Sequence, residues 1–225
     1  MMPMNIAIDG PVGAGKSWVA DEVAARLGIL HLDTGAMYRT LGLCALRQGV
    51  NPQDEAAVSA CCEAAEISVR YENGAQRTLL FGEDVTDLIR TGEVSSAASA
   101  VSKWAAVRSK MVRAQQELAK TADMLIDGRD IGTVVLADSP CKIYLTASAE
   151  ARARRRYLQN MEKGDDTPYE QVLAELNARD YQDMHREVTP LRQAEDAVLV
   201  DSTNMTREET VEAILAIVEE VYGKR

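Results

Sequence analysis

Short apolar runs alternate with amphipathic stretches along most of this chain. Five runs of aliphatic and β-branched residues have the length of buried strands: residues 5–9, 29–33, 124–127, 142–147 and 197–201. Between them, apolar residues recur at helical spacing, most clearly over residues 17–27 and 207–222. Strands that alternate with helices are typical of an α/β fold, so we expect a parallel, doubly wound sheet.

Two stretches break this alternation. Residues 67–85 have the pattern of short strands around the turn Asn73-Gly74, which predicts an inserted subdomain with a small antiparallel sheet. Residues 150–191 are polar and rich in arginine, and they predict two helices joined by a loop. Thr167-Pro168-Tyr169-Glu170 has the spacing of a capping box with proline at the first helical position, so the second helix is expected to begin there.

The charge balance narrows the classes of protein to consider. The chain has 225 residues, with 25 Lys and Arg against 35 Asp and Glu, and a net charge of −10. This balance disfavours a nucleic-acid or membrane partner, and no apolar run approaches the ~18 residues of a membrane span. The first residues contain no basic region or cleavage site, so we expect a cytoplasmic protein. The four cysteines form no CxxC pair, and we expect neither a zinc site nor a disulfide framework.

The strongest motif lies between the first expected strand and the first expected helix. Gly10–Ser17 fits the pattern G-x-x-x-x-G-K-[ST] of a phosphate-binding loop. In such a loop, backbone N–H groups turn toward phosphate oxygens, Lys16 reaches the β and γ phosphates, and Ser17 is the candidate ligand of Mg²⁺. The alternative is a glycine-rich turn that only begins a helix.

Polar groups also follow the second and third expected strands. Leu32–Arg39 and Ile126–Asp130 each bring an aspartate and an arginine to the sheet edge that carries the phosphate loop. Since arginine binds phosphate in a bidentate manner, these segments predict a second phosphorylated ligand. Asp33 and Asp127 are candidates to orient water bound to Mg²⁺. With Lys16, Asp127 is included among the candidate catalytic residues.

On these motifs the chain resembles the bacterial cytidylate kinases, a family of nucleoside monophosphate kinases. The likeness covers almost the whole length, and its most specific features are DGRDIGTVV and the strand-rich insert before IRTGEVSSAAS. It implies Mg²⁺-dependent transfer of the γ-phosphoryl group of ATP to CMP, and also to dCMP. It further implies a core of about residues 1–60, 105–149 and 190–225, with a monophosphate-binding subdomain (about 61–104) and a mobile, arginine-rich helical lid (about 150–189).

The resemblance also implies site residues. Those that match the ATP-phosphate loop are Gly10, Pro11, Val12, Gly13, Ala14, Gly15, Lys16, Ser17 and Trp18. Those that match CMP-contacting positions are Thr34, Arg39, Ser99, Arg108, Arg129, Asp130, Arg179, Asp183 and Arg186. Of these, Ser99, Arg108 and Asp130 look like readers of the cytosine ring. Asp130 can accept a hydrogen bond from the exocyclic amine, which uracil lacks.

Spacing bears on part of this assignment. Residues 179, 183 and 186 follow the series i, i+4, i+7, so one helix would present them on one face, although a solvated salt-bridge face has the same pattern. Ser99 and Arg108 lie nine residues apart, which on one continuous helix would turn them about 180° from each other. The resemblance therefore requires a helix break between them, near Lys103-Trp104.

The polar stretch begins with four arginines within residues 152–156. Because neighbouring cations repel one another, we expect this cluster to include an arginine that faces a phosphate. Arg155 and Arg179 are the candidates to meet the charge of the transferred phosphoryl group. His31 and His185 are interpreted as structural, since phosphoryl transfer needs no histidine.

Trp18 departs from the family, which usually has a small residue, often threonine, at this place. Three interpretations stay open. The missing hydroxyl weakens ATP binding, the indole packs on the nucleotide or the lid, or Trp18 packs only locally.

Two rival functions also stay open. One is a kinase for another small acceptor, such as UMP or a non-nucleotide. The other is a nucleotide-binding switch that signals through the inserted sheet. For the cytidylate kinase interpretation we expect ATP and CMP or dCMP as partners and a monomeric protein.

Overall fold

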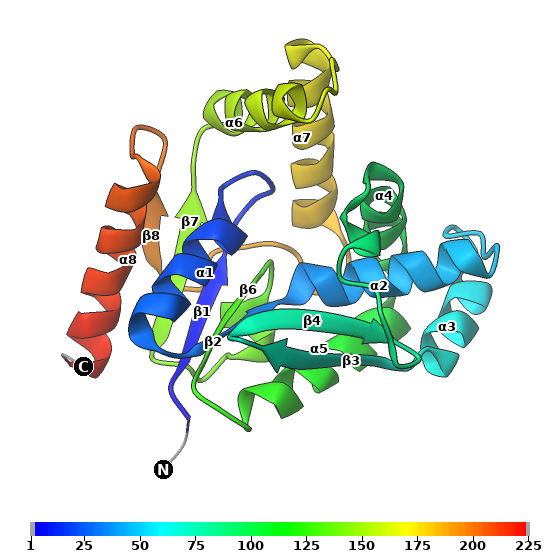
Figure 1. Ribbon diagram of the computed structural model, residues 1–225, viewed down its shortest axis with the longest axis horizontal. Helices are drawn as coiled ribbons and strands as arrows, with labels where there is room; N and C mark the ends of the chain where they lie inside the picture. Colours follow the sequence, from blue (N-terminus) through cyan, green and yellow to red (C-terminus); the bar gives the residue numbers. More distant parts are fainter. Residues whose placement is uncertain (1–2, 224–225) are drawn as a thin grey trace. The chain divides into compact units, whose positions relative to one another are not determined.

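The computed structural model describes residues 3–223 and contains two sheets (Figure 1). The strands of the main sheet are β1 (Asn5–Asp9), β2 (Leu30–Asp33), β6 (Met124–Gly128), β7 (Cys141–Thr146) and β8 (Val198–Asp201). Their order is β2-β6-β1-β7-β8, and β1 pairs in parallel with β7, as β7 does with β8. The predicted α/β fold is confirmed, and each strand end lies within one residue of its predicted place.

The strand order gives β1 a special position. Its neighbours are β6 on one side and β7 on the other, so the chain winds away from β1 in both directions. In open α/β sheets, ligands bind beyond the carboxyl ends of the strands at such a reversal. Ile6, Ala7 and Ile8 of β1 are fully buried, which fixes the strand that leads into the phosphate loop.

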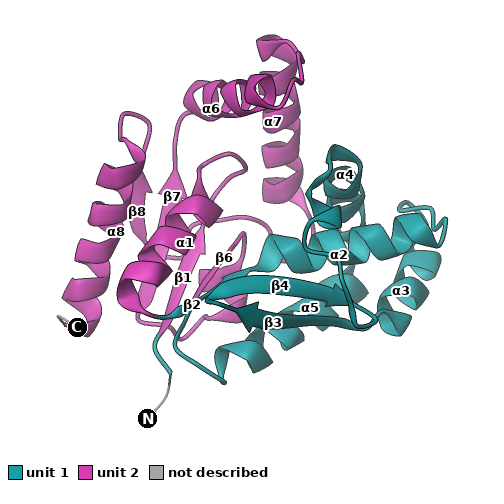
Figure 2. Ribbon diagram, viewed as in Figure 1, with its two compact units in different colours: residues 1–4, 29–124 teal, residues 5–28, 125–225 magenta. Residues whose placement is uncertain are grey.

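The chain divides into two compact units (Figure 2). Unit 1 comprises Ile29–Met124 with the segment before β1, and unit 2 comprises Asn5–Gly28 and the chain from Leu125 onward. The helices of unit 2 are α1 (Lys16–Leu27), α6 (Ala149–Glu162), α7 (Tyr169–His185) and α8 (Arg207–Tyr222), with a π-helical turn η2 (Ile131–Val135) after β6. The predicted pair of helices in the polar stretch is therefore confirmed as α6 and α7 (Figure 1).

Unit 1 contains the second sheet and its own helices. The helices are α2 (Thr34–Arg47), α3 (Glu55–Ala64), the 3₁₀ turn η1 (Leu88–Arg90), α4 (Gly92–Val101) and α5 (Ala105–Ala119). The strands β3 (Ile67–Glu72), β4 (Ala75–Leu80) and β5 (Glu83–Asp84) form an antiparallel sheet. Asn73 and Gly74 both have positive φ, at 52° and 81°, which suits the two-residue hairpin that the sequence predicted.

The predicted helix break between Ser99 and Arg108 is confirmed. α4 ends at Val101 and α5 begins at Ala105. Trp104 has an extended backbone, with ψ 135°, and its indole N–H donates to the carbonyl of Pro52 at 3.0 Å. The side chain of Trp104 thus anchors the turn that redirects the chain.

The predicted start of α7 is wrong in its detail. The helix begins at Tyr169, with Pro168 at the N-cap position, and no side chain caps it. The Thr167 hydroxyl, which the capping box would use, donates instead to Asp165 at 2.5 Å. A local turn around Asp165 therefore competes successfully for the Thr167 hydroxyl.

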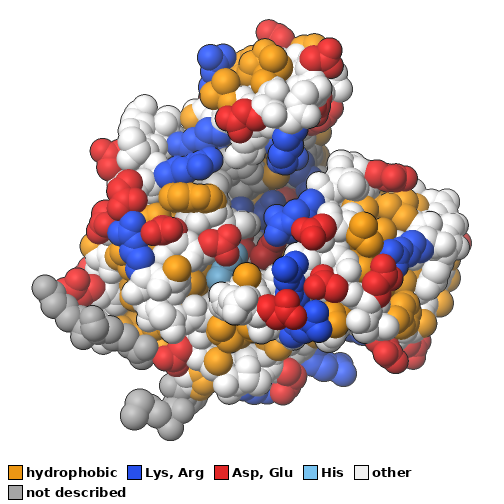
Figure 3. All heavy atoms as spheres, in the orientation of Figure 1, with side chains coloured by type: hydrophobic (Ala, Val, Ile, Leu, Met, Phe, Trp, Pro, Cys, Tyr) orange, Lys and Arg blue, Asp and Glu red, His pale blue; other side chains and the backbone are white. Residues whose placement is uncertain are grey.

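Charged side chains of both signs are interspersed over the face shown in Figure 3. In unit 2, Arg26 of α1 donates to Glu208 and Glu212 of α8 at 2.7 and 2.6 Å, and these ion pairs tie the two helices together. Across residues 3–223, no helix combines the length and the apolar character needed to cross a membrane.

Close packing of α2 on α4 gives the first prediction. A Cβ added at Gly42 of α2 would lie 2.7 Å from the backbone nitrogen of Ala98 and 3.1 Å from the carbonyl oxygen of Val94. Gly42→Ala should therefore lower the free energy of unfolding by about 1–3 kcal/mol, since overpacking outweighs the gain in helix propensity. Urea unfolding measures this change.

Gly92→Ala is the matched control, because an added Cβ there meets nothing within 4 Å. Its stability should stay within about 0.5 kcal/mol of wild type or exceed it. Equal stability of the two variants would contradict the tight contact between α2 and α4.

Candidate functional site

Three glycines of the Gly10–Ser17 loop have backbone conformations that suit a tight turn. Gly10, Gly13 and Gly15 have φ of 154°, 76° and 91°, which residues with a Cβ rarely adopt. A Cβ added at Gly10 would lie 1.9 Å from the carbonyl oxygen of Leu145 in β7. The loop follows β1 directly and leads into α1, as the motif predicts.

Lys16 lies buried against this loop. Its ammonium donates to the carbonyls of Gly10 and Pro11 at 2.7 and 2.8 Å. Burial lowers the pKa of Lys16 to about 7, and the nearby guanidinium of Arg129 acts in the same direction. An anion placed in the loop would favour the charged form of Lys16.

Ser17 and Asp127 come together at the carboxyl ends of β1 and β6. The Ser17 hydroxyl donates to a carboxylate oxygen of Asp127 at 3.0 Å, and Asp127 is buried. A hydroxyl and a carboxylate are hard oxygen donors of the kind that Mg²⁺ accepts beside substrate phosphates. Among the described residues there is no cluster of three His, Cys, Asp or Glu side chains suited to hold a metal alone. The Ser17 and Asp127 side chains therefore fit a magnesium ion whose other ligands are substrate phosphates and water, rather than an ion bound by protein side chains alone.

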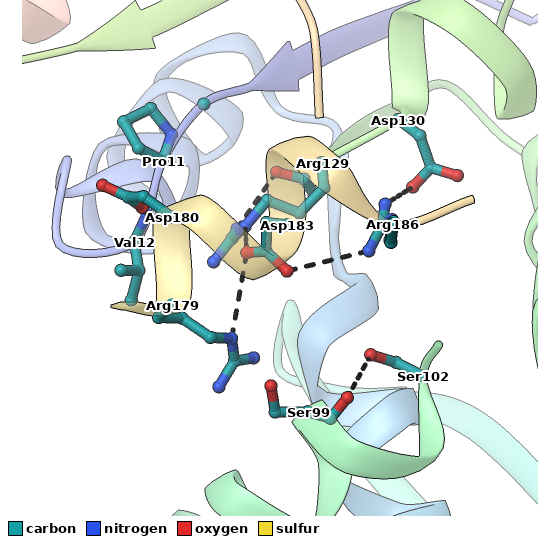
Figure 4. A network of polar contacts seen from close by, with 12 residues as sticks. Pro11, Val12, Ser99, Ser102, Arg129, Asp130, Arg179, Asp180, Asp183 and Arg186 are labelled. Atoms are coloured by element: carbon teal, nitrogen blue, oxygen red, sulfur yellow. Dashed lines mark hydrogen bonds and ion pairs between the residues drawn. The ribbon is translucent and has the colours of Figure 1, made fainter. Parts of the chain in front are cut away.

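Three arginines surround the carboxylate of Asp183 (Figure 4). Arg129, which follows β6, donates through Nε at 2.8 Å. The guanidinium nitrogens of Arg179 and Arg186 each lie 3.8 Å from a carboxylate oxygen. Burial alone would favour the neutral carboxyl, but the arginines outweigh it and hold the pKa of Asp183 below its usual value. Asp183 is therefore a fixed anion that orients three cations.

Arg186 joins this cluster from just outside α7. The helix ends at His185, and Arg186 occupies the C-cap with an extended backbone, ψ 144°. The prediction of one continuous helix through position 186 is therefore wrong. The predicted proximity of residues 179, 183 and 186 nevertheless holds, because Arg186 still contacts Asp183. Arg186 also lies 3.6 Å from Asp130, and both of these side chains are buried (Figure 4).

A second buried ion pair joins α6 and α7 to the phosphate loop. Arg152 donates to Asp180 at 2.5 Å and to the carbonyl of Val12 at 2.8 Å. The other carboxylate oxygen of Asp180 accepts the backbone N–H of Val12 at 3.1 Å. Val12 also packs on the small apolar cluster of Ala153, Val172 and Leu176. Both polar groups of one loop residue are thus satisfied by the two helices.

The remaining arginines of the 152–156 cluster differ in their surroundings. Arg155 donates to the carbonyl and hydroxyl of Ser202, after β8, at 2.5 and 3.2 Å. Burial and the charge of Arg207 lower the pKa of Arg155. Arg154 and Arg156 are exposed. Contacts therefore distinguish the four arginines, which the sequence pattern alone could not do.

Unit 1 carries four of the predicted acceptor residues, two of them at the start of α2. Thr34 is the first residue of the helix and is buried. Asp33 caps the helix by accepting the N–H of Ala36 at 3.0 Å, and it pairs with Arg39 at 2.7 Å. Gln76 of β4, which the sequence interpretation did not include, accepts the backbone N–H of Asp33 at 2.7 Å.

The other two, Ser99 and Arg108, lie on either side of the helix break. Arg108 is buried, with its guanidinium 5.2 Å over the ring of Tyr38. It donates to the carbonyl of Ser102 at 3.4 Å, and the Ser102 hydroxyl donates to the carbonyl of Ser99 at 2.9 Å. The break thus brings both residues to one short segment.

Two buried carboxylates were absent from the predicted site. Asp9, at the end of β1, accepts the N–H groups of Ile131 and Gly132 at 2.8 and 2.7 Å. Asp180 is the second, and the sequence prediction names its neighbours Arg179 and Asp183 instead. The only sequence signal was position, since Asp9 ends a strand and Asp180 lies three residues before Asp183.

Trp18 and the histidines have local partners. The guanidinium of Arg207 lies 5.0 Å over the Trp18 ring, which is 40% exposed. This contact is compatible with local packing and leaves the other two interpretations of Trp18 as predictions. His31 is buried, and His185 stacks on Tyr181. All four cysteines are buried, and none forms a disulfide.

Comparison with known proteins gives one consistent family. Residues 6–220 match the family model described as cytidylate kinase. The chain is 48% identical over 223 residues to a cytidylate kinase of Caldicellulosiruptor saccharolyticus, covering 99% of both chains. It is 46% identical over 221 residues to one of Bacillus cereus, covering 98% of both. A solved structure of a protein from Eubacterium ventriosum, 11% identical, shares the fold with a TM-score of 0.50 over 98% of this chain and 99% of that chain.

The ion pair between Arg152 and Asp180 gives the second prediction. Arg152→Ala should lower the free energy of unfolding by about 3–5 kcal/mol, because it leaves the Asp180 carboxylate buried without its cation. Arg154→Ala, on an exposed position of the same helix, should change stability by no more than about 0.5 kcal/mol. Thermal and urea unfolding of both variants test this, and similar losses for the two arginines would contradict the assignment.

Proposed function

The chain belongs to the cytidylate kinase family, and on that premise we propose how its residues hold two substrates. Membership makes the protein a phosphotransferase with ATP as donor and CMP as acceptor. The main support for the proposal is that three groups suited to bind phosphate and magnesium lie within unit 2. The phosphate loop, the Ser17–Asp127 pair and the arginine cluster around Asp183 all belong to this unit.

The donor phosphates are proposed to lie in the Gly10–Ser17 loop. Backbone N–H groups at the start of α1 would bind phosphate oxygens, and Lys16 would exchange its two loop carbonyls for the β and γ phosphates. The pKa of about 7 for Lys16 supports this, because burial is the largest cause of the shift and a phosphate anion in the loop would oppose it.

Magnesium is proposed to be held by Ser17 and, through water, by Asp127. When bound, the ion would offset the negative charge of the donor phosphates. The protein's part is to keep the Ser17 hydroxyl and the Asp127 carboxylate on one side of the loop, where the 3.0 Å contact already aligns them.

The acceptor-binding residues are proposed to be those that the resemblance assigns, some of them in each unit. In unit 2, Asp130 accepts from the cytosine amine, while Arg129, Asp183 and Arg186 form the charged frame around it. The residues of unit 1 assigned to the same substrate are Thr34, Arg39, Ser99 and Arg108. In the frame, the Asp183 carboxylate orients the arginines before a phosphate arrives.

Charge on the transferred phosphoryl group is proposed to be met by Arg179 and Arg155. Arg179 is tied to Asp183 at 3.8 Å, and Arg155 is fixed on Ser202. No general base is needed, since the acceptor phosphate is already an anion. Catalysis then consists of alignment and charge stabilisation by groups that are in place before reaction.

Further proposals follow from the same interpretation. dCMP would serve as a second acceptor, and the protein would act as a cytoplasmic monomer without nucleic-acid or membrane partners. Residues of about 150–189 would form a lid, residues of about 61–104 a monophosphate-binding subdomain, and the rest the core. Closure of the lid would exclude water, which otherwise turns phosphoryl transfer into ATP hydrolysis.

A coupled assay of ADP formation tests the proposed specificity. ADP should form rapidly from ATP with CMP or dCMP, much more slowly with UMP, AMP or shikimate, and hardly at all without an acceptor. Equal rates with UMP would indicate a general pyrimidine kinase. Nucleotide binding without turnover would indicate a switch module.

The donor site gives the third prediction. Lys16→Ala should fold but lose about a hundredfold to a thousandfold in kcat, because it removes a cation aimed at the reacting phosphates. Steady-state kinetics with saturating CMP measure the loss. Turnover near that of wild type would contradict the role of Lys16.

The acceptor site gives the fourth prediction. Asp130→Asn should lower the ratio of kcat/KM for CMP over UMP by about tenfold or more, since an amide can donate to the uracil carbonyl and a carboxylate can only accept. An unchanged ratio would show that Asp130 does not read the base. Asp138→Asn, at an exposed aspartate of the same unit, is the control and should leave the ratio at its wild-type value.

A further inference from the structure

Asp9 is a buried carboxylate that the proposed mechanism does not use. It is the last residue of β1 and directly precedes Gly10, the first residue of the phosphate loop. Its side chain points to a different segment, the turn that follows β6. There Oδ1 accepts the N–H of Ile131 at 2.8 Å, and Oδ2 accepts the N–H of Gly132 at 2.7 Å.

These two N–H groups belong to the first residues of the π-helical turn η2. The first N–H groups of any helical turn lack partners within that turn. Further along, Val135 and Leu136 donate to the carbonyls of Asp130 and Ile131 at 3.3 and 2.7 Å. Asp9 therefore completes the hydrogen bonding of η2 from another strand and acts as its N-terminal cap.

The cap is held at an electrostatic cost. Asp9 is only 4% exposed, and burial raises its pKa to about 6 although the two backbone hydrogen bonds oppose the shift. The nearby carboxylate of Asp130 also raises the pKa, and the ammonium of Lys16 lowers it. A neutral side chain would avoid this cost, so a role tied to the geometry of η2 accounts better for the carboxylate.

Gly132 permits the close approach of that carboxylate. A Cβ added there would lie 3.4 Å from Oδ2 of Asp9 and 3.3 Å from Cδ of Lys142. The Cβ itself would make ordinary van der Waals contact with Oδ2, and atoms beyond the Cβ would press on the cap from the side of the turn. Because Gly132 has no side chain, the Asp9 carboxylate has room at the start of the turn.

The residue that the cap fixes most directly is Asp130. It immediately precedes Ile131, and its backbone, with φ −141° and ψ 28°, makes the change from β6 to the π-helical turn. Its side chain faces Arg186 at 3.6 Å. A shift of the N–H groups at 131 and 132 would move the Asp130 carboxylate relative to that guanidinium.

We propose that Asp9 is a positioning residue for base recognition, which holds the turn after β6 so that Asp130 meets the exocyclic amine of cytosine. The proposal rests on the base-reading role proposed for Asp130. One strand end then serves both substrates. The backbone of Asp9 leads into the Gly10–Ser17 loop, which is proposed to bind ATP. The Asp9 carboxylate holds the turn η2, which follows Asp130.

Asp9→Asn is the primary test, because the amide keeps the size of the side chain but offers only one acceptor oxygen. Amide hydrogen exchange at Ile131 and Gly132 should accelerate at least about tenfold as one N–H loses its partner. The kcat/KM for CMP should fall by about tenfold to a hundredfold, and the CMP over UMP ratio should fall with it. The CMP over UMP ratio is the discriminating readout, because general destabilisation, or the loss of the Asp9 charge beside Lys16, would affect both acceptors alike.

Ser139→Ala is the matched control. Ser139 is also buried in unit 2, and its hydroxyl donates to the carbonyl of Asn5, at the opposite end of β1, at 2.6 Å. This variant loses a buried hydrogen bond of β1 but should keep wild-type exchange at Ile131 and Gly132 and a wild-type CMP over UMP ratio.

A second variant covers the case in which Asp9→Asn does not fold. Gly132→Val keeps the carboxylate and places γ carbons beyond a Cβ that would already lie 3.4 Å from it, so the CMP over UMP ratio should fall while the KM for ATP stays near wild type. Unchanged exchange in Asp9→Asn, or an unchanged ratio in both variants, would overturn the proposal.

The two proposals can fail separately. If Asp130→Asn leaves base discrimination unchanged, the proposed reader is wrong, and the exchange measurement still shows whether Asp9 holds the turn. If Asp130→Asn alters discrimination and the Asp9 and Gly132 variants do not, only the positioning role is lost.

Discussion

The structure of unit 2 depends on the requirement that buried charges be neutralised by charges of opposite sign. Arg152, Asp180 and Asp183 all lie at 7% exposure or less. An unpaired ion in such surroundings would cost several kcal/mol, so each position constrains the others. Asp183 is balanced by arginines from the end of β6 and from α7, and Asp180 is balanced by Arg152 from α6. The fold around the phosphate loop is therefore determined as much by charge pairing as by apolar packing.

This constraint prepares the site for phosphoryl transfer. Groups that stabilise developing charge are most effective when they are oriented before the reaction, because they then need no reorganisation as it proceeds. Arg129 is held by Asp183 at 2.8 Å, and Val12 of the loop is held at both its N–H and its carbonyl. The same pairing ties α6 and α7 to the loop. A change in the position of these helices must therefore change the hydrogen bonds of the loop itself.

The sequence predicted the parts of the molecule that local rules decide. Strand runs, the Asn73-Gly74 hairpin and the glycine pattern of the loop depend on a few adjacent residues, and the structure agrees with each of them. Contacts between distant segments were beyond those rules. Nothing near Asp180 in the sequence distinguishes it from Asp183, and only the approach of Val12 and Arg152 shows its role. The predicted capping box at Thr167 does not form, because another local interaction competes for the same side chain. The Thr167 hydroxyl donates to Asp165, two residues earlier, and does not cap α7.

The two tryptophans divide evenly between the compact units. Trp18 of unit 2 follows the phosphate loop, and the guanidinium of Arg207 lies 5.0 Å over its ring. Trp104 of unit 1 lies at the helix break, and the ammonium of Lys103 lies 4.3 Å over its ring. Each indole emits from a setting that a cation perturbs. A protein with either tryptophan replaced by phenylalanine would therefore have an intrinsic fluorophore confined to one unit. The events at the donor loop and at the segment between Ser99 and Arg108 could then be followed as separate optical signals, without an added dye.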